Sequence, residues 1–371
     1  MKQRRLQTLC LPVVLAIAVL LSGCGEKESE SHAGYDFQLN MAENTAYGFA
    51  DTKDGFLFAK DYYLYHTDEN MQPKPVCIRG GCLHDKDVDI NINCDAFIEN
   101  AESMFYYDEH LYVLANNRKS VLCLTEYTTA GIFVRSVSVL PDSARNMIQH
   151  RGAFYYSFDS EGTAAVVKLK EADSKSSVIY RSRYSNGSLE PVLAYDKYVY
   201  IRETDLTGEN PSCMLIYNTE SNEVSVLESD KVIICDGMLL FDKNSDESDR
   251  VWTSKPNGEK QKETDFELKA DSTLLCAFGE YIIEASSITE ENKTQRFTVY
   301  KDDELFFEFT LENVEGRNWS TRPADGIIWT DEHIFILPQM KDGDHAIVEI
   351  DKAGFERGEF ESRIIFEPRN Y

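Results

Sequence analysis

A short pattern of polar and apolar positions recurs along the chain. Each copy begins with a turn of Asp, Gly or another small polar residue and continues with alternating aromatic and aliphatic residues. Such a turn reverses the chain tightly, and alternation with a period of two is typical of a strand with one buried face. The copies occupy residues 54–58, 108–113, 151–156, 196–200, 236–241, 279–283 and 331–336. The pattern therefore predicts a repeated, strand-rich unit.

The spacing of the copies decides which fold we expect. Seven equivalent turn positions are separated by 54, 43, 45, 40, 43 and 52 residues, and these values bracket the length of one four-stranded propeller blade. The positions are Gly55, Glu109, Gly152, Lys197, Gly237, Glu280 and Glu332. We predict an all-β fold, a β-propeller over residues 43–371 with seven blades. The two longer gaps can hold insertions, so six or eight blades also fit, and a pair of β-sandwiches is the alternative fold.

The composition agrees with strands and argues against two kinds of partner. The 371 residues include 20 Tyr and 20 Phe, and aromatic enrichment favours strands. The formal net charge is −26, and every acidic residue lies after Cys24. Because phosphate binding needs clustered Lys and Arg, this charge argues against nucleic acid and against direct adhesion to anionic lipid. We interpret the acidity as a source of solubility rather than as a site for a cationic ligand.

The N-terminus has the layout of an export signal. Lys2, Arg4 and Arg5 precede an apolar run at residues 11–21, which is too short to span a bilayer stably. The following Leu21-Ser22-Gly23-Cys24 resembles the bacterial lipobox. That resemblance implies that residues 1–23 are a removed signal peptide and that Cys24 is the lipidated mature N-terminus; an ordinary signal with a chance cysteine is the alternative. Residues 24–42 follow as a tether, and the charged stretch 25–34 is expected to be disordered because it has too little apolar surface to bury.

A cysteine-rich insert at residues 75–97 interrupts the repeats. Cys77, Cys82, His84 and Cys94 have the spacing C-x4-C-x-H-x9-C. Thiolate and imidazole are the ligands that zinc prefers, so the insert is a candidate structural zinc site. Outside the cytoplasm a disulfide with one spare thiol is an alternative, and free thiols are a third. Each bonded version would cross-link the insert, which indicates a structural role.

Other cysteines and one acidic stretch in the chain suggest less chemistry. Cys123, Cys213, Cys235 and Cys276 lie in apolar, strand-like surroundings, so we expect buried small hydrophobic residues there rather than ligands. Within the insert, Asp85, Asp87, Asp89, Asn91 and Asn93 alternate with other residues. The stretch lacks the Gly and Glu of an EF-hand loop, and we favour a solvated loop over a calcium site.

The insert and the repeats together resemble a known group of proteins. Aromatic propeller strands, a lipobox and the residues Cys77, Cys82, His84, Cys94 and Ala96 are similar to uncharacterised TolB-like propeller lipoproteins of Gram-positive anaerobes. The resemblance implies a propeller held by lipid on the extracytoplasmic face of the cell membrane. It implies no reaction, and the stretch between His84 and Cys94 is longer here than in that pattern.

The sequence contains no G-x-S-x-G elbow, H-E-x-x-H helix or phosphate-binding loop, so we predict no catalytic residues. His110 and His333 occupy equivalent places in two repeat units, which favours a role in blade packing or in a turn. We therefore expect a non-enzymatic binding or scaffold protein for an extracellular protein, peptide or glycan. An extracellular hydrolase or lyase with carboxylates in the propeller channel is the alternative, and a sensor or scaffold subunit of a transport or signalling system is a third.

Overall fold

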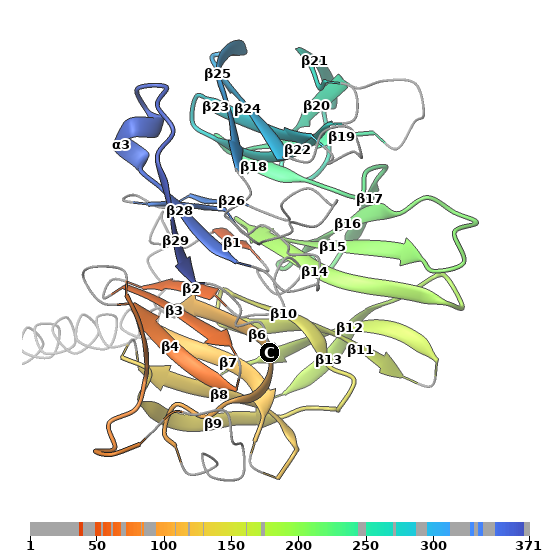
Figure 1. Cartoon of the computed structure of the whole chain (residues 1–371). Coiled ribbons are helices and arrows are strands. Elements are labelled where there is room, and N and C mark those ends of the chain that lie inside the picture. Colours follow the sequence, from red (N-terminus) through yellow and green to blue (C-terminus); the bar gives the residue numbers. More distant parts are fainter. Residues whose placement is uncertain are drawn as a thin grey trace, which may run out of the picture. The chain divides into compact units, whose positions relative to one another are not determined.

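Seven antiparallel sheets make up the described chain in the computed structural model (Figure 1). The structure describes residues 37–39 and 49–366, except for 53–54, 61, 68–71, 83, 85–93, 108, 118, 129, 161, 172–174, 244–249, 270–271, 287–294, 312–326, 330–332 and 337–345. Residues 37–371 form one compact unit. Cys24, the signal peptide and most of the tether therefore lie outside the described residues.

Each sheet contains one blade of four strands that are consecutive in the sequence, and one sheet carries β1 as an additional fifth strand. The bounds of the strands in the first four blades are as follows. Blade 1 has β2 (Phe49–Thr52), β3 (Gly55–Lys60), β4 (Tyr63–Thr67) and β5 (Pro73–Pro75). Blade 2 has β6 (Glu99–Tyr107), β7 (His110–Asn116), β8 (Leu122–Thr128) and β9 (Phe133–Val139). Blade 3 has β10 (Arg145–His150), β11 (Ala153–Ser160), β12 (Thr163–Lys170) and β13 (Ser176–Arg181), and blade 4 has β14 (Gly187–Tyr195), β15 (Tyr198–Asp205), β16 (Cys213–Asn218) and β17 (Val224–Leu227).

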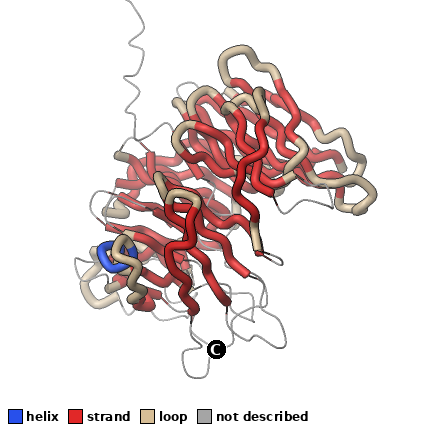
Figure 2. The backbone as a smooth tube through the Cα atoms, turned by 90° about the horizontal axis from the view of Figure 1, so that it is seen from above, coloured by secondary structure: helices blue, strands red, loops and turns tan. Residues whose placement is uncertain are grey.

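The remaining three blades follow the same order. Blade 5 has β18 (Ile233–Cys235), β19 (Met238–Asp242), β20 (Arg250–Ser254) and β21 (Lys262–Glu267). Blade 6 has β22 (Ser272–Phe278), β23 (Tyr281–Ser286), β24 (Gln295–Lys301) and β25 (Glu304–Leu311). Blade 7 has β26 (Ile327–Trp329), β27 (Ile334–Ile336), β28 (Ile347–Ile350) and β29 (Ser362–Phe366). The described residues contain one helix, the short α3 (Lys352–Phe355) shown in Figure 2, and no helix among them is both long and apolar enough to cross a bilayer.

The predicted repeat marks the same place in every blade, the turn between its first and second strands. In blades 3 and 5 the two turn residues both have positive φ, 48° and 69° at Arg151-Gly152 and 47° and 73° at Asp236-Gly237. Two consecutive positive φ values are typical of the type I′ turn, whose twist matches that of the flanking strands. The turn chemistry therefore explains why the repeat was visible in the sequence, and the blade count is seven.

Burial follows the position of a strand within its blade. Inner strands such as β7 and β16 are buried almost continuously, whereas the fourth strand β9 is mostly exposed. Strict alternation fails in the inner strands because each blade is covered by neighbours on both faces. Buried clusters join successive blades around the ring.

Side-chain packing closes the ring between blades 7 and 1. The ring centroids of Phe56 and Phe335 lie 4.5 Å apart, and Phe56 also meets His333 at 5.2 Å. No strand in the described chain crosses between these two blades, because each sheet contains only consecutive strands apart from β1.

One additional strand lies on the inner side of the ring. The first strands of neighbouring blades contact one another, as β6 contacts β10 and β10 contacts β14. The short strand β1 (Phe37–Leu39) pairs antiparallel with β14 and also contacts β10. Backbone hydrogen bonds thus occupy the channel-facing edge of blade 4 with the N-terminal segment of the same chain.

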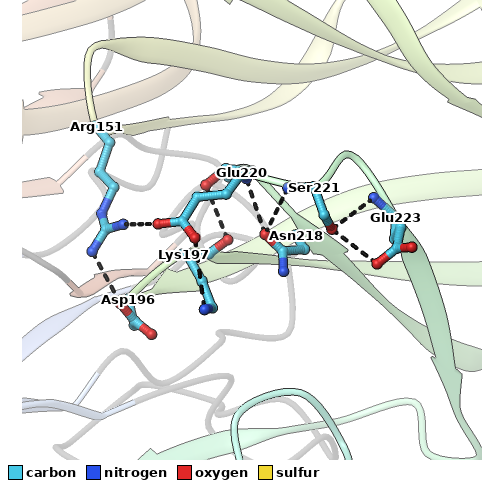
Figure 3. Close-up of polar contacts among 8 residues, drawn as sticks. Arg151, Asp196, Lys197, Asn218, Glu220, Ser221 and Glu223 are labelled. Atoms are coloured by element: carbon cyan, nitrogen blue, oxygen red, sulfur yellow. Dashed lines mark hydrogen bonds and ion pairs between the residues drawn. The ribbon is translucent and has the colours of Figure 1, made fainter.

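Polar contacts supplement the apolar packing between blades 3 and 4 (Figure 3). A guanidinium nitrogen of Arg151 lies 3.0 Å from the carboxylate of Asp196 and another lies 3.8 Å from that of Glu220. Lys197 approaches the same Glu220 at 3.6 Å. A ring nitrogen of the buried His150 lies 2.6 Å from the carbonyl oxygen of Asp196. These contacts join the first turn of blade 3 to two turns of blade 4, the turn at Asp196-Lys197 and the turn that carries Glu220.

Candidate metal centre and binding pocket

The cysteine loop, defined as residues 75–97, is held against strand β4 at both of its ends. The amide of Val76 donates a hydrogen bond to the carbonyl of Leu64 at 2.8 Å, and the amide of Leu64 donates to the carbonyl of Ala96 at 2.8 Å. After the loop, the amide of Ile98 donates to the carbonyl of Tyr62 at 2.7 Å. The two arms of the loop are therefore fixed side by side.

This arrangement brings together the four residues predicted as ligands. The sulfur atoms of Cys77, Cys82 and Cys94 and a ring nitrogen of His84 all lie within 4.8 Å of one another. Cys94 is buried and the other three are half-buried. The three sulfur atoms are not bonded to each other. Residues 85–93, including the stretch weighed as a calcium loop, lie outside the described residues.

The geometry and the donor set both fit a tetrahedral zinc ion. Zn–S bonds of about 2.3 Å place tetrahedral ligands about 3.8 Å apart, so a separation of at most 4.8 Å requires only a small contraction. The Nε2 atom of His84 is buried and has no hydrogen-bond partner among the described residues. A buried ring nitrogen without a partner costs free energy unless another group, such as a cation, satisfies it. The residues can thus hold a metal.

The protein environment distinguishes two of the thiols. Burial raises the pKa of Cys77, but the neighbouring His84 ring and the backbone amides of Arg79 and Asp95 outweigh it and lower this pKa to about 6. Burial and the thiols of Cys77 and Cys82 raise the pKa of Cys94 to about 12. The cluster therefore already stabilises negative charge on one sulfur atom.

Aromatic packing and one ion pair support the cluster. Tyr63, Cys94 and Ala96 are buried together, and the ring of Tyr63 meets the ring of His84 edge-on at 6.2 Å. The Nε atom of Arg79 lies 2.9 Å from a carboxylate oxygen of Asp95, which joins the two arms of the loop across the cluster.

A pocket lies between the cysteine loop and blade 2. Its cavity volume is about 550 Å³, and its walls come from the loop on one side and from strands β7, β8 and β9 on the other. Three apolar side chains at its edge are exposed: Ile78 by 78%, Ile132 by 49% and Phe133 by 61%. We refer to these three residues as the rim. Exposed apolar side chains gathered around one cavity are typical of an interaction site.

The hairpin between β8 and β9 approaches the loop very closely at Gly131. This residue has a φ of +75°, and a Cβ atom built there would lie 2.4 Å from Cγ1 of Val76. Only glycine fits such a contact, because it has no side chain and adopts positive φ without strain. The hairpin that carries Ile132 and Phe133 is therefore packed directly on the loop.

The sequence indicated the four candidate ligands Cys77, Cys82, His84 and Cys94, but it did not reveal the pocket. The rim residues Ile132 and Phe133 begin an outer strand whose apolar residues look ordinary in the sequence. The only available signal was Gly131 beside two large apolar residues in a hairpin, and that signal does not reveal what the hairpin touches.

His110 and His333 make equivalent contacts in their two blades, each with a buried glutamate of the same blade. Nδ1 of His110 lies 2.8 Å from Glu126, and Nδ1 of His333 lies 2.6 Å from Glu349. In both blades the same buried glutamate also pairs with an arginine of the fourth strand: Glu126 with Arg135 and Glu349 with Arg363. Each glutamate thus links the second, third and fourth strands of its own blade.

The four cysteines that the structure describes outside the cysteine loop differ in burial. Cys123 and Cys213 are buried, as predicted, but Cys213 also accepts a hydrogen bond from Arg183 at 2.7 Å. Cys235 and Cys276 are only half-buried. Cys235 donates a hydrogen bond across the blade boundary to the carbonyl of Gly279 at 3.4 Å.

Two further buried glutamates are also engaged by nearby groups rather than by each other. Glu203 accepts hydrogen bonds from Ser182 and from the amide of Arg183, each at 2.9 Å. Glu284 accepts from the amide of Lys269 at 3.0 Å and from the hydroxyl of Tyr300 at 3.1 Å. Hydrogen bonds from neighbouring groups thus satisfy the buried carboxylates of Glu203 and Glu284.

The comparisons with known proteins establish the class. No family model matches the chain, and no curated protein matches it in sequence. Solved propellers do match. A structure from a study of two prolyl endopeptidases has a TM-score of 0.54 and 13% identity, covering 89% of this chain and 52% of that one. Hsv2 from Kluyveromyces lactis has a TM-score of 0.50 and 8% identity, covering 86% of this chain and 96% of that one.

At these identities the likeness concerns the fold alone, and the chain is a seven-bladed, all-β propeller. Its neighbours include a protein named as a peptidase. A shared propeller does not carry that activity over, because function resides in sites rather than in folds.

Proposed function

We propose that this chain is a lipid-anchored, non-enzymatic binding protein of the extracytoplasmic face of the bacterial membrane. Its pocket takes an apolar segment of an extracellular protein or peptide. The observation that carries the proposal is the cavity of about 550 Å³ with the exposed apolar rim of Ile78, Ile132 and Phe133. An apolar rim suits a peptide side chain better than a glycan, which presents mainly hydroxyl groups.

A zinc ion at Cys77, Cys82, His84 and Cys94 is the second part of the proposal. Thiolate and imidazole at these separations are suited to zinc, and four protein ligands leave no open position for a substrate. The role of the ion is therefore structural: it holds the two arms of the cysteine loop, with the Arg79–Asp95 ion pair beside it.

The lipid anchor is the third part, and it rests on the sequence. Leu21-Ser22-Gly23-Cys24 resembles a lipobox, and the acidic stretch that follows suits a tether. Anchoring would present the propeller to partners outside the cell. It would also limit contact with the membrane to the lipid, because the net charge of −26 opposes adhesion to anionic headgroups.

The proposed binding role can be tested by selecting peptides from a random library on the chain from Gly34 onward. We expect the selected peptides to lose at least tenfold in affinity on Phe133→Ser, since a tenfold loss corresponds to about 1.4 kcal/mol. Leu305→Ser is the matched control, because Leu305 is 59% exposed against 61% for Phe133 and lies on blade 6. Equal binding by the two variants would show that the selected peptides do not use the pocket.

A further inference from the structure

The candidate metal ligands and the lining of the pocket adjoin along the chain, and Cys94 belongs to both. Val76 and Ile78, on either side of Cys77, line the pocket, and Cys94 lines it together with the following Asp95. One candidate ligand, Cys94, is thus part of the pocket wall, and a second, Cys77, lies between two residues of that wall. A shift of the backbone at Cys77 or Cys94 would therefore move side chains that face the cavity.

The opposite wall has no room to compensate for such a displacement. Gly131 approaches Val76 so closely that even a methyl group would not fit between them. A close-packed contact of this kind transmits a shift instead of absorbing it. The rim side chains on the hairpin, Ile132 and Phe133, adjoin this glycine in the sequence and line the same cavity.

Among the described residues of the loop, backbone hydrogen bonds at its two ends, apolar packing on Tyr63 and one ion pair fix the two arms. The backbone bonds to β4 hold its ends at Val76 and Ala96, and the Arg79–Asp95 pair is partly exposed. An exposed ion pair contributes little to holding a segment in place. The cluster of Cys77, Cys82, His84 and Cys94 is the point at which a single ion would tie the middle of the loop to its far arm.

We infer that the pocket is zinc-dependent: zinc at the cysteine cluster orders the pocket wall, so zinc and the apolar ligand bind with positive coupling. This inference rests on the proposed binding role of the pocket. Because coupling between two sites is reciprocal, the factor by which zinc tightens ligand binding must equal the factor by which ligand tightens zinc binding.

The test uses the chain from Gly34 onward, which contains the whole compact unit 37–371, with Nile red as a neutral apolar probe. We expect zinc-loaded protein to bind the probe at least tenfold more tightly than protein stripped with a chelator. Zinc affinity, measured by chelator competition, should rise by the same factor when the probe is saturating. Circular dichroism of both forms checks that the propeller itself stays folded.

Three variants separate the outcomes. Phe133→Ser should abolish the zinc-dependent part of probe binding, whereas Leu305→Ser should leave it unchanged. Cys82→Ser should bind the probe as weakly as the stripped protein, with or without zinc. If zinc-loaded and stripped protein bind the probe equally while Phe133→Ser still weakens binding, the coupling is refuted but the binding role of the pocket is supported.

If Phe133→Ser has no effect in either form, the binding role of the pocket is refuted, and the coupling is refuted as well. A chain that takes up no zinc overturns the coupling directly.

Discussion

At the residue scale, the cysteine cluster is the most specific chemistry in the chain. Its four ligand atoms come from two arms that are 17 residues apart at Cys77 and Cys94, yet they lie within 4.8 Å of one another. Backbone pairing of both arms with β4 produces this proximity. The cysteine and histidine types were readable in the sequence, but their convergence depends on hydrogen bonds that the spacing does not encode.

Loss of one ligand should remove the metal. We expect the purified chain to contain about one zinc ion, and we expect Cys82→Ser to contain much less, because three ligands bind zinc far more weakly than four. Elemental analysis of the purified proteins makes the measurement. Cys123→Ser is the control, since Cys123 is buried in β8 outside the cluster. Purified protein that contains no zinc and has a disulfide within the cysteine loop would contradict the predicted zinc site.

A second residue-scale prediction concerns acid. Hydrogen bonds from Asn210 and Thr207 lower the pKa of the Asp205 carboxyl below its ordinary value of 3.8. A lowered pKa in the folded state means that Asp205 stabilises the fold above that ordinary value and loses this effect as the pH falls through the folded value. Asp205→Asn should therefore lower the midpoint of thermal unfolding at neutral pH. The difference in this midpoint between the variant and the parent should decrease as the pH falls below about 4. A difference that does not depend on pH would refute the stabilising role of the Asp205 carboxylate.

At the element scale, the turns between first and second strands were predictable and the contacts between blades were not. Residues such as Asp236-Gly237 encode a tight turn locally, and Arg151-Gly152 form the same kind of turn in blade 3. The pairing of β1 with β14 joins residues 37–39 to residues 193–195, and nothing in either segment indicates the other. The pocket was equally unpredictable from the sequence, because its walls come from the cysteine loop and from a hairpin of the next blade.

The closure of the ring gives a prediction about elements. Phe56→Ala removes a buried ring that packs on Phe335 and His333 at the junction of blades 1 and 7. We expect a loss of about 3–5 kcal/mol in the free energy of unfolding. Denaturant unfolding followed by circular dichroism measures it. Phe133→Ser, at an exposed position, should change this free energy by no more than about 0.5 kcal/mol. Similar losses in the two variants would mean that the junction does not stabilise the ring.

At the scale of the whole molecule, the proposed function depends on where the propeller is held. The described chain is one compact propeller unit, and its inner side already carries the strand β1. That strand begins at Phe37, 13 residues after Cys24. A lipid on Cys24 would thus be joined by a short acidic segment to a strand inside the ring. Under the proposed lipidation, this segment would keep the propeller at the membrane.

The most direct test of this account is mass spectrometry of the mature protein extracted from bacterial membranes. The account predicts an N-terminal peptide that begins at Cys24 and carries a diacylglyceryl group on its sulfur atom. A Cys24→Ser chain should lack that modification and should leave the membrane fraction. An unmodified N-terminus at any other residue would contradict the anchor, and with it the extracytoplasmic binding role proposed for the pocket.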